Sequence, residues 1–258
     1  MRILSMLAVI LLVPLLAAEP KAKVLAGKVL SRKYHFKEAG KDMTYSLFLP
    51  RAYSAKKKWP LVVALHGLYS SPWQIMRYPG LVTQADKLGY IVVAPMGYNN
   101  RGWYGSRGQR SVGSNPRNLG ELSEKDVLNV LAIVEKEFAV DDRNIFLMGH
   151  SMGGGGTWHL GMKYPKKWAA LAPLAPAPPR NIDDLHKIKD TPVVMVMGTK
   201  DFLWRSGLNW VAAMKKLEME FEYIEVKGGG HVVPVIAKLP AVFAFFEKHR
   251  RKPLTKPE

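Results

Sequence analysis

The segment Gly149-His150-Ser151-Met152-Gly153 constrains the fold more than any other part of the sequence. Residues 144–148 before it, apolar after Asn144, predict a buried strand, and residues 157–164 after it predict a helix that ends at Pro165. A chain that passes from strand to helix this quickly must turn tightly, and glycine at 149 and 153 removes side chains that would collide there. The turn raises the Ser151 hydroxyl above the sheet edge, where the helix N-terminus favours negative charge. Ser151 is therefore the candidate nucleophile.

Strands and helices are predicted to alternate along the rest of the chain. Several segments, such as 60–65 and 90–94, are continuous apolar runs. Such runs suit strands that are buried on both faces of a parallel sheet. The pattern predicts a three-layer α/β fold, with a mostly parallel central sheet and helices on both faces. The Pro-rich segment 175–191 is too short for a large cap domain. The other expected strands are 44–49, 60–65, 90–94, 168–174, 192–197 and 221–226, and the other expected helices are 81–88, 121–138, 206–217 and 235–249.

The first 18 residues have the pattern of a secretory signal peptide: a positive start at Arg2, an apolar run over 3–16, and small residues at 17–18. The apolar run is shorter than the roughly 20 residues that a membrane-spanning helix needs. We expect cleavage, no stable membrane insertion afterwards, and a single domain over 19–258. An uncleaved N-terminal anchor is the alternative. The predicted location is secreted or periplasmic, and the absence of cysteine is compatible with export.

The chain is strongly basic, with a formal net charge of +17. Such a balance favours contact with anionic surfaces or polymers. Nucleic acid is not the expected partner, because the lysines are spread along the chain and no DNA- or RNA-binding motif accompanies them. A solvated basic surface is the simplest interpretation.

A serine hydroxyl needs a base to take its proton. Where a serine occupies such a strand-to-helix turn, the acid and then the histidine follow it in the chain. His186 precedes the expected acid and His249 lies in the last predicted helix, whereas His231 follows the last strand through three glycines. Asp201 follows the strand 192–197, and its carboxylate would fix the imidazole tautomer. The predicted triad is Ser151, Asp201 and His231.

The anion that forms when serine attacks a carbonyl needs two N–H donors. One is the backbone N–H of Met152, the residue after the nucleophile. The other is expected in the loop after the strand 60–65. Leu68 is the first choice there and Tyr69 the near alternative, while the His66 side chain is expected to order the loop.

Together these motifs resemble the α/β-hydrolase superfamily over nearly the whole chain after residue 18. The segments that carry the resemblance are Leu65-His66-Gly67, Gly149 to Gly154, Gly198 to Asp201, and Gly230-His231. The chain is most similar to secreted esterases of the polyhydroxybutyrate-depolymerase, feruloyl-esterase and prolyl-oligopeptidase-like group. The resemblance implies hydrolysis of carboxylic esters through an acyl-enzyme, without metal or cofactor. A serine peptidase and a non-catalytic carbohydrate- or envelope-binding protein are the alternatives.

Substrate contacts are expected from the loop 97–105, which leaves the carboxyl end of a strand, where ligands bind in open α/β sheets. Trp103 and Tyr104, with Tyr69 nearby, are the candidates for stacking on an aromatic or sugar group. The alternative is that these aromatic rings only pack the loop down. With no large cap, the site is predicted to be open and suited to bulky or polymer-attached esters. The expected partner is a small-molecule or polymer-attached ester substrate.

Overall fold

The computed structural model describes residues 25–108, 115–179 and 182–251. The predicted signal peptide, residues 1–18, lies outside the described residues. None of the helices in the described ranges is long and apolar enough to cross a membrane.

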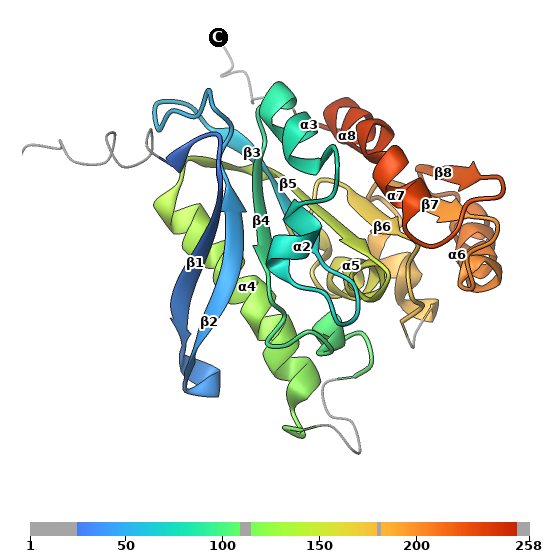
Figure 1. The fold of residues 1–258 in the computed structure, drawn as a ribbon. Helices are drawn as coiled ribbons and strands as arrows, with labels where there is room; N and C mark the ends of the chain where they lie inside the picture. The colour runs from blue at the N-terminus through green and yellow to red at the C-terminus, as the bar shows by residue number, and fades with distance from the viewer. Residues whose placement is uncertain (1–24, 109–114, 180–181, 252–258) are drawn as a thin grey trace, which may run out of the picture.

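Eight strands form one sheet, in the spatial order β1-β2-β4-β3-β5-β6-β7-β8 (Figure 1). β1 is antiparallel to β2, and β2 is antiparallel to β4. Strands β3 to β8 all run parallel to one another, so the sheet is mostly parallel, as predicted. The strands are β1 (Val29–Phe36), β2 (Lys41–Phe48), β3 (Trp59–Leu65), β4 (Ile91–Pro95), β5 (Val140–His150), β6 (Leu171–Leu174), β7 (Val193–Gly198) and β8 (Phe221–Val226).

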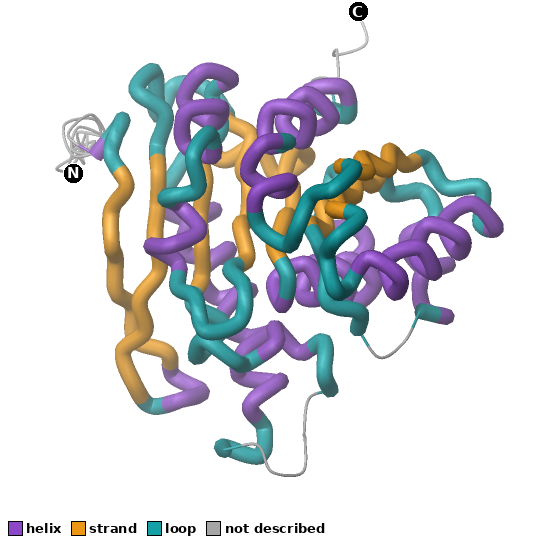
Figure 2. Tube along the Cα trace, turned by 45° about the vertical axis from the view of Figure 1, so that its right-hand side comes forward, coloured by secondary structure: helices purple, strands orange, loops and turns teal. Residues whose placement is uncertain are grey.

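Helices cover both faces of the sheet, which confirms the three-layer prediction (Figure 2). One core forms against α4 (Leu119–Glu137), α5 (Met152–Lys163) and α6 (Trp204–Lys216). The other forms against α2 (Pro72–Met76), α3 (Leu81–Leu88), α7 (Val233–Ala237) and α8 (Leu239–Lys248). Short 3₁₀ turns complete the described structure: η1 (Lys37–Ala39), η2 (Trp103–Gly105), η3 (Pro165–Lys167) and η4 (Asp183–Ile188).

Strand β3 shows why the apolar runs form central strands. All seven of its residues are buried. Because side chains alternate along a strand, Leu61 and Val63 join the α4–α6 core while Val62 and Ala64 join the opposite one. A strand that feeds two cores has no solvent-facing positions for polar residues.

The structure differs from the prediction mainly where local sequence preference is weak. Strand β1 was not predicted, because its polar residues alternate along an edge strand. Helix α5 begins at Met152 rather than at 157, although four glycines occupy its first turns. The predicted helix 235–249 is instead two helices, α7 and α8, which meet at Lys238.

The parallel arrangement places the carboxyl ends of β3 to β8 at one edge of the sheet. The loops that leave these strands carry all the predicted site residues. Between β6 and β7 the described residues form only the short turn η4, so no large cap covers this edge in that part of the chain.

Candidate active site

Ser151 occupies a strained turn between β5 and α5. Its backbone φ is 58° and its ψ −115°, a region that residues with a side chain rarely adopt. A Cβ placed on Gly149 would lie 2.2 Å from the Gly153 carbonyl oxygen, and one on Gly153 would lie 2.1 Å from the Leu65 carbonyl oxygen. Both positions therefore require glycine, for the reason that the sequence suggested.

The turn is held by backbone hydrogen bonds from β6 and from the segment that follows it. The Ser151 N–H donates to the Leu174 carbonyl at 2.9 Å, and the Ser151 carbonyl accepts from the Ala177 N–H at 2.9 Å. A strained backbone conformation persists only when the surrounding contacts hold it in place. These two hydrogen bonds are part of that restraint.

Asp201 and His231 come together across the edge of the sheet. His231 Nδ1 lies 2.8 Å from Asp201 Oδ2, and the Asp201 side chain is completely buried. The other carboxylate oxygen accepts the Leu203 N–H at 2.8 Å, which fixes the rotation of the carboxylate. Asp201 thus fixes the orientation of the His231 ring, as the predicted triad requires.

The His231 ring lies beside the Ser151 turn, with its centroid 4.7 Å from that of His150. The Ser151 hydroxyl makes no hydrogen bond to any other described residue. Such contacts often tighten only when substrate binds.

His150 is a site residue that the sequence analysis did not single out. Its side chain is buried, with Nε2 3.0 Å from the His231 carbonyl oxygen and Nδ1 2.8 Å from the Tyr78 hydroxyl. Burial and the nearby His231 lower the pKa of His150 to about 4, so the ring is neutral at pH 7. A carbonyl can only accept, so Nε2 carries the proton and donates, and Nδ1 accepts from Tyr78.

The predicted anion-binding groups lie in the expected loop, close to Ser151. A Cβ on Gly67 would lie 3.6 Å from the Ser151 Cβ. The Tyr69 N–H already donates to the Asn100 carbonyl at 2.8 Å, whereas the Leu68 and Met152 N–H groups have no backbone acceptor among the described residues. This geometry favours Leu68 over Tyr69 as the second donor.

The predicted aromatic residues separate into two groups. Tyr104 has 0% exposed surface, and its hydroxyl donates to the His66 carbonyl at 3.3 Å. The expectation that Tyr104 stacks on a substrate is therefore wrong for this structure. Its ring fits where Gly97 and Gly156 lack a side chain, and it supports the loop that carries Leu68.

Trp103 and Tyr69 instead border open space. They line a cavity of about 600 Å³ together with Leu68, Arg101 and Arg107. The Arg107 guanidinium stacks over the Trp103 ring at 4.2 Å. The buried His66 ring, within 2.8 Å of the Gly67 carbonyl and 2.9 Å of the Met96 carbonyl, joins the two loops that form this cavity.

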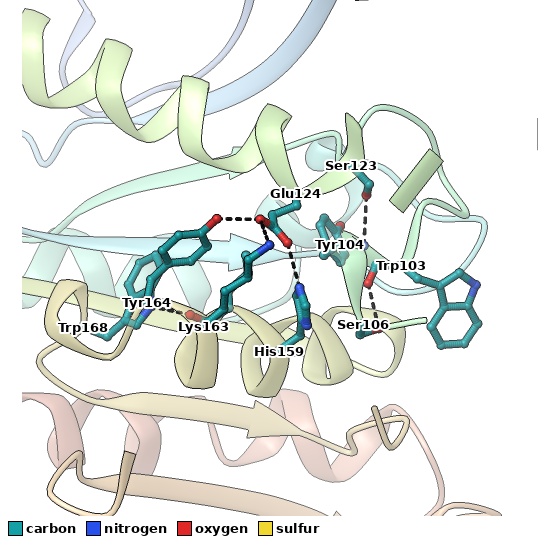
Figure 3. Close-up of polar contacts among 10 residues, drawn as sticks. Trp103, Tyr104, Ser106, Ser123, Glu124, His159, Lys163, Tyr164 and Trp168 are labelled. Atoms are coloured by element: carbon teal, nitrogen blue, oxygen red, sulfur yellow. Dashed lines mark hydrogen bonds and ion pairs between the residues drawn. The ribbon is translucent and has the colours of Figure 1, made fainter. Parts of the chain in front are cut away.

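A buried carboxylate ties α5, the helix that follows Ser151, to α4. Glu124 on α4 contacts His159 Nε2 at 2.8 Å, Lys163 Nζ at 2.6 Å and the Tyr164 hydroxyl at 2.5 Å (Figure 3). Burial alone would raise the pKa of Glu124, but these three hydrogen bonds outweigh it and lower the pKa to about 2. The carboxylate is charged and fully paired, so it anchors α5.

Comparison with known proteins assigns the chain to a family. Residues 37–234 match the family model described as "Putative esterase". The chain belongs to this esterase family. The match spans η1 to the start of α7, and it includes Ser151, Asp201 and His231.

Two curated relatives share part of the sequence. The chain is 27% identical over 143 residues to a bifunctional acetylxylan esterase/xylanase of Neocallimastix patriciarum, which covers 55% of this chain and 19% of the relative. It is 33% identical over 140 residues to the acylamino-acid-releasing enzyme of Sus scrofa, which covers 53% of this chain and 18% of the relative. The matches thus span about a fifth of these relatives' length.

Solved structures share the fold at low identity. A ferulic acid esterase superposes with a TM-score of 0.70 and 18% identity, over 86% of this chain and 99% of the other. The fluorophosphonate-binding serine hydrolase FphF of Staphylococcus aureus gives a TM-score of 0.69 and 17% identity, over 88% and 100%. The predicted resemblance to α/β-hydrolases is confirmed.

Proposed function

We propose that this protein hydrolyses carboxylic esters through an acyl-enzyme formed on Ser151. The observation that carries the proposal is the hydrogen bond between buried Asp201 and His231, beside a serine in a strained strand-to-helix turn. Membership of the esterase family and the names of the relatives above support the choice of an ester.

In the first half-reaction, His231 Nε2 takes the Ser151 hydroxyl proton while Oγ attacks the carbonyl carbon. The resulting oxyanion accepts hydrogen bonds from the N–H groups of Leu68 and Met152. As the tetrahedral intermediate collapses, the bond to the alcohol oxygen breaks and His231 returns the proton to that oxygen.

Water then hydrolyses the acyl-enzyme by the same route. His231 takes a proton from the water, whose oxygen attacks the acyl carbon, and gives it to Ser151 as the acid leaves. The Asp201 carboxylate stabilises the imidazolium in both steps.

Amide hydrolysis is the second candidate, favoured by the 33% identity to an acylamino-acid-releasing enzyme. The same residues would act, but His231 would have to protonate a poorer leaving group, an amine. For location, we propose export, which rests on the signal-peptide pattern of residues 1–18.

Initial rates on p-nitrophenyl acetate, butyrate and octanoate, methyl ferulate and a peptide anilide test both candidates. We expect ester turnover that is lost in Ser151→Ala, with little turnover of the anilide. Faster anilide hydrolysis would favour the peptidase, and ester turnover that persists in Ser151→Ala would refute the assignment.

A further inference from the structure

The large apolar side chains that remain exposed gather around the candidate active site. Seven such side chains are exposed in the described residues, and six of them lie on the segments that follow β3, β7 and β8. We call these six the apolar rim: Leu68, Tyr69, Trp73, Phe202, Val232 and Val233.

The apolar rim is built into the same loops as the site residues. Phe202 directly follows Asp201, and its ring lies 4.8 Å from the His231 ring while 77% of its surface stays exposed. Val233, two residues after His231, is 74% exposed, and Tyr69 in the Leu68 loop is 68% exposed. An exposed apolar group of this kind, around a functional site, marks a surface that contacts something apolar.

The same edge of the sheet is basic and nearly free of carboxylates. Among the described residues, the segments 66–80, 96–108, 115–118, 175–179, 199–203 and 227–232 contain one acidic residue, Asp201, which is buried against His231. They contain many lysines and arginines, among them the exposed Arg77, Arg101, Lys200 and Lys227. The nearest carboxylates in the flanking elements lie in the first turns of η4 and α4. Asp184 in η4 pairs with Lys187 at 2.7 Å, and Glu121 in α4 pairs with Lys125 at 3.1 Å.

Apolar and basic groups on one face suit a particular partner. A neutral apolar substrate gives the lysines and arginines no role, and an anionic polymer gives the apolar rim none. A bilayer with anionic headgroups accommodates both, because apolar side chains enter the acyl boundary while basic ones meet the phosphates.

We infer that this face docks on an anionic lipid surface, with the apolar rim inserted at the interface and the basic loops against the headgroups. That a lipid ester would then reach Ser151 rests on the function proposed above. The docking itself does not need turnover.

Vesicle co-sedimentation of the purified protein tests this inference directly. We expect binding to phosphatidylcholine vesicles containing 30% phosphatidylglycerol to be at least tenfold tighter than to pure phosphatidylcholine, and to weaken strongly when NaCl rises from 0.05 to 0.5 M. All variants share one N-terminus, so the predicted signal segment cannot account for differences between them.

Two double variants separate the apolar and the basic contributions. Trp73→Ser with Val233→Ser should weaken binding to anionic vesicles at least fivefold, whereas Leu208→Ser, the seventh exposed apolar residue, on α6, should not. Arg77→Ser with Lys200→Ser should weaken it by about fivefold for each charge removed.

Equal binding to neutral and anionic vesicles, or an apolar-rim variant that binds like Leu208→Ser, would overturn the inference. So would binding to heparin or to polyester particles but not to vesicles. Hydrolysis of soluble p-nitrophenyl butyrate, measured on the same samples, separates failure of docking from failure of the proposed chemistry.

Discussion

Replacing Glu124 with glutamine should weaken the attachment of the nucleophile helix by a calculable amount. The substitution keeps the size of the side chain but removes the charge that His159, Lys163 and Tyr164 share. A pKa lowered from 4.5 to about 2 corresponds to about 3 kcal/mol of folding free energy. The Lys163 and His159 side chains keep 33% and 21% exposure, so we reduce the expected loss to about 2 kcal/mol.

The stabilisation by Glu124 depends on pH in a direction set by its lowered pKa. Because the carboxylate has a lower pKa in the folded state than in the unfolded state, its stabilisation is complete above pH 4.5 and is lost as the pH falls towards 2. The difference between wild type and Glu124→Gln should therefore be largest near pH 7 and less than half as large at pH 3.

Urea unfolding followed by tryptophan fluorescence at pH 7, 5, 4 and 3 measures these differences. The matched control is Glu121→Gln on the same helix, whose partly exposed pair with Lys125 is worth about 0.5 kcal/mol or less. A loss below 0.5 kcal/mol for Glu124→Gln at pH 7, or the same loss at pH 3 and pH 7, would refute the reasoning.

Two further substitutions probe the nucleophile turn. His150→Ala removes the donor that holds the His231 carbonyl, so kcat for an ester should fall about tenfold or more with little change in KM. His150→Gln keeps a donor and should recover most of the rate. Equal loss in both variants, or loss of folded protein, would contradict a positioning role. Gly153→Ala should destabilise the fold by about 3 kcal/mol, because its Cβ would meet the Leu65 carbonyl. Thermal unfolding measures this loss. The control Gly230→Ala should show no such loss, because a Cβ there meets nothing within 4 Å.

The sequence predicted those parts of the site that depend on chain order and local turns. Ser151, Asp201 and His231 each follow a strand of the parallel part of the sheet, β5, β7 and β8, and parallel strands bring their carboxyl ends to one edge whatever the loops do. The geometry now places Asp201 against His231 and leaves the Leu68 N–H without a backbone acceptor, in line with those expectations.

The parts that sequence reasoning missed depend on contacts between distant residues. Tyr78 and His150 are 72 positions apart, and nothing in either segment indicates that they meet. Tyr104 lies in a loop where substrate-binding aromatic residues are expected, yet glycines at 97 and 156 leave room for its ring inside the fold. Only the three-dimensional packing separates Tyr104 from Trp103.

The most direct test of the central claim is labelling with a fluorophosphonate, located by peptide mass spectrometry. The account predicts a single adduct on Ser151, absent in Ser151→Ala and formed at least a hundredfold more slowly in His231→Ala and in Asp201→Ala. An adduct on a different serine, or unchanged labelling of Ser151 when His231 is replaced, would contradict it.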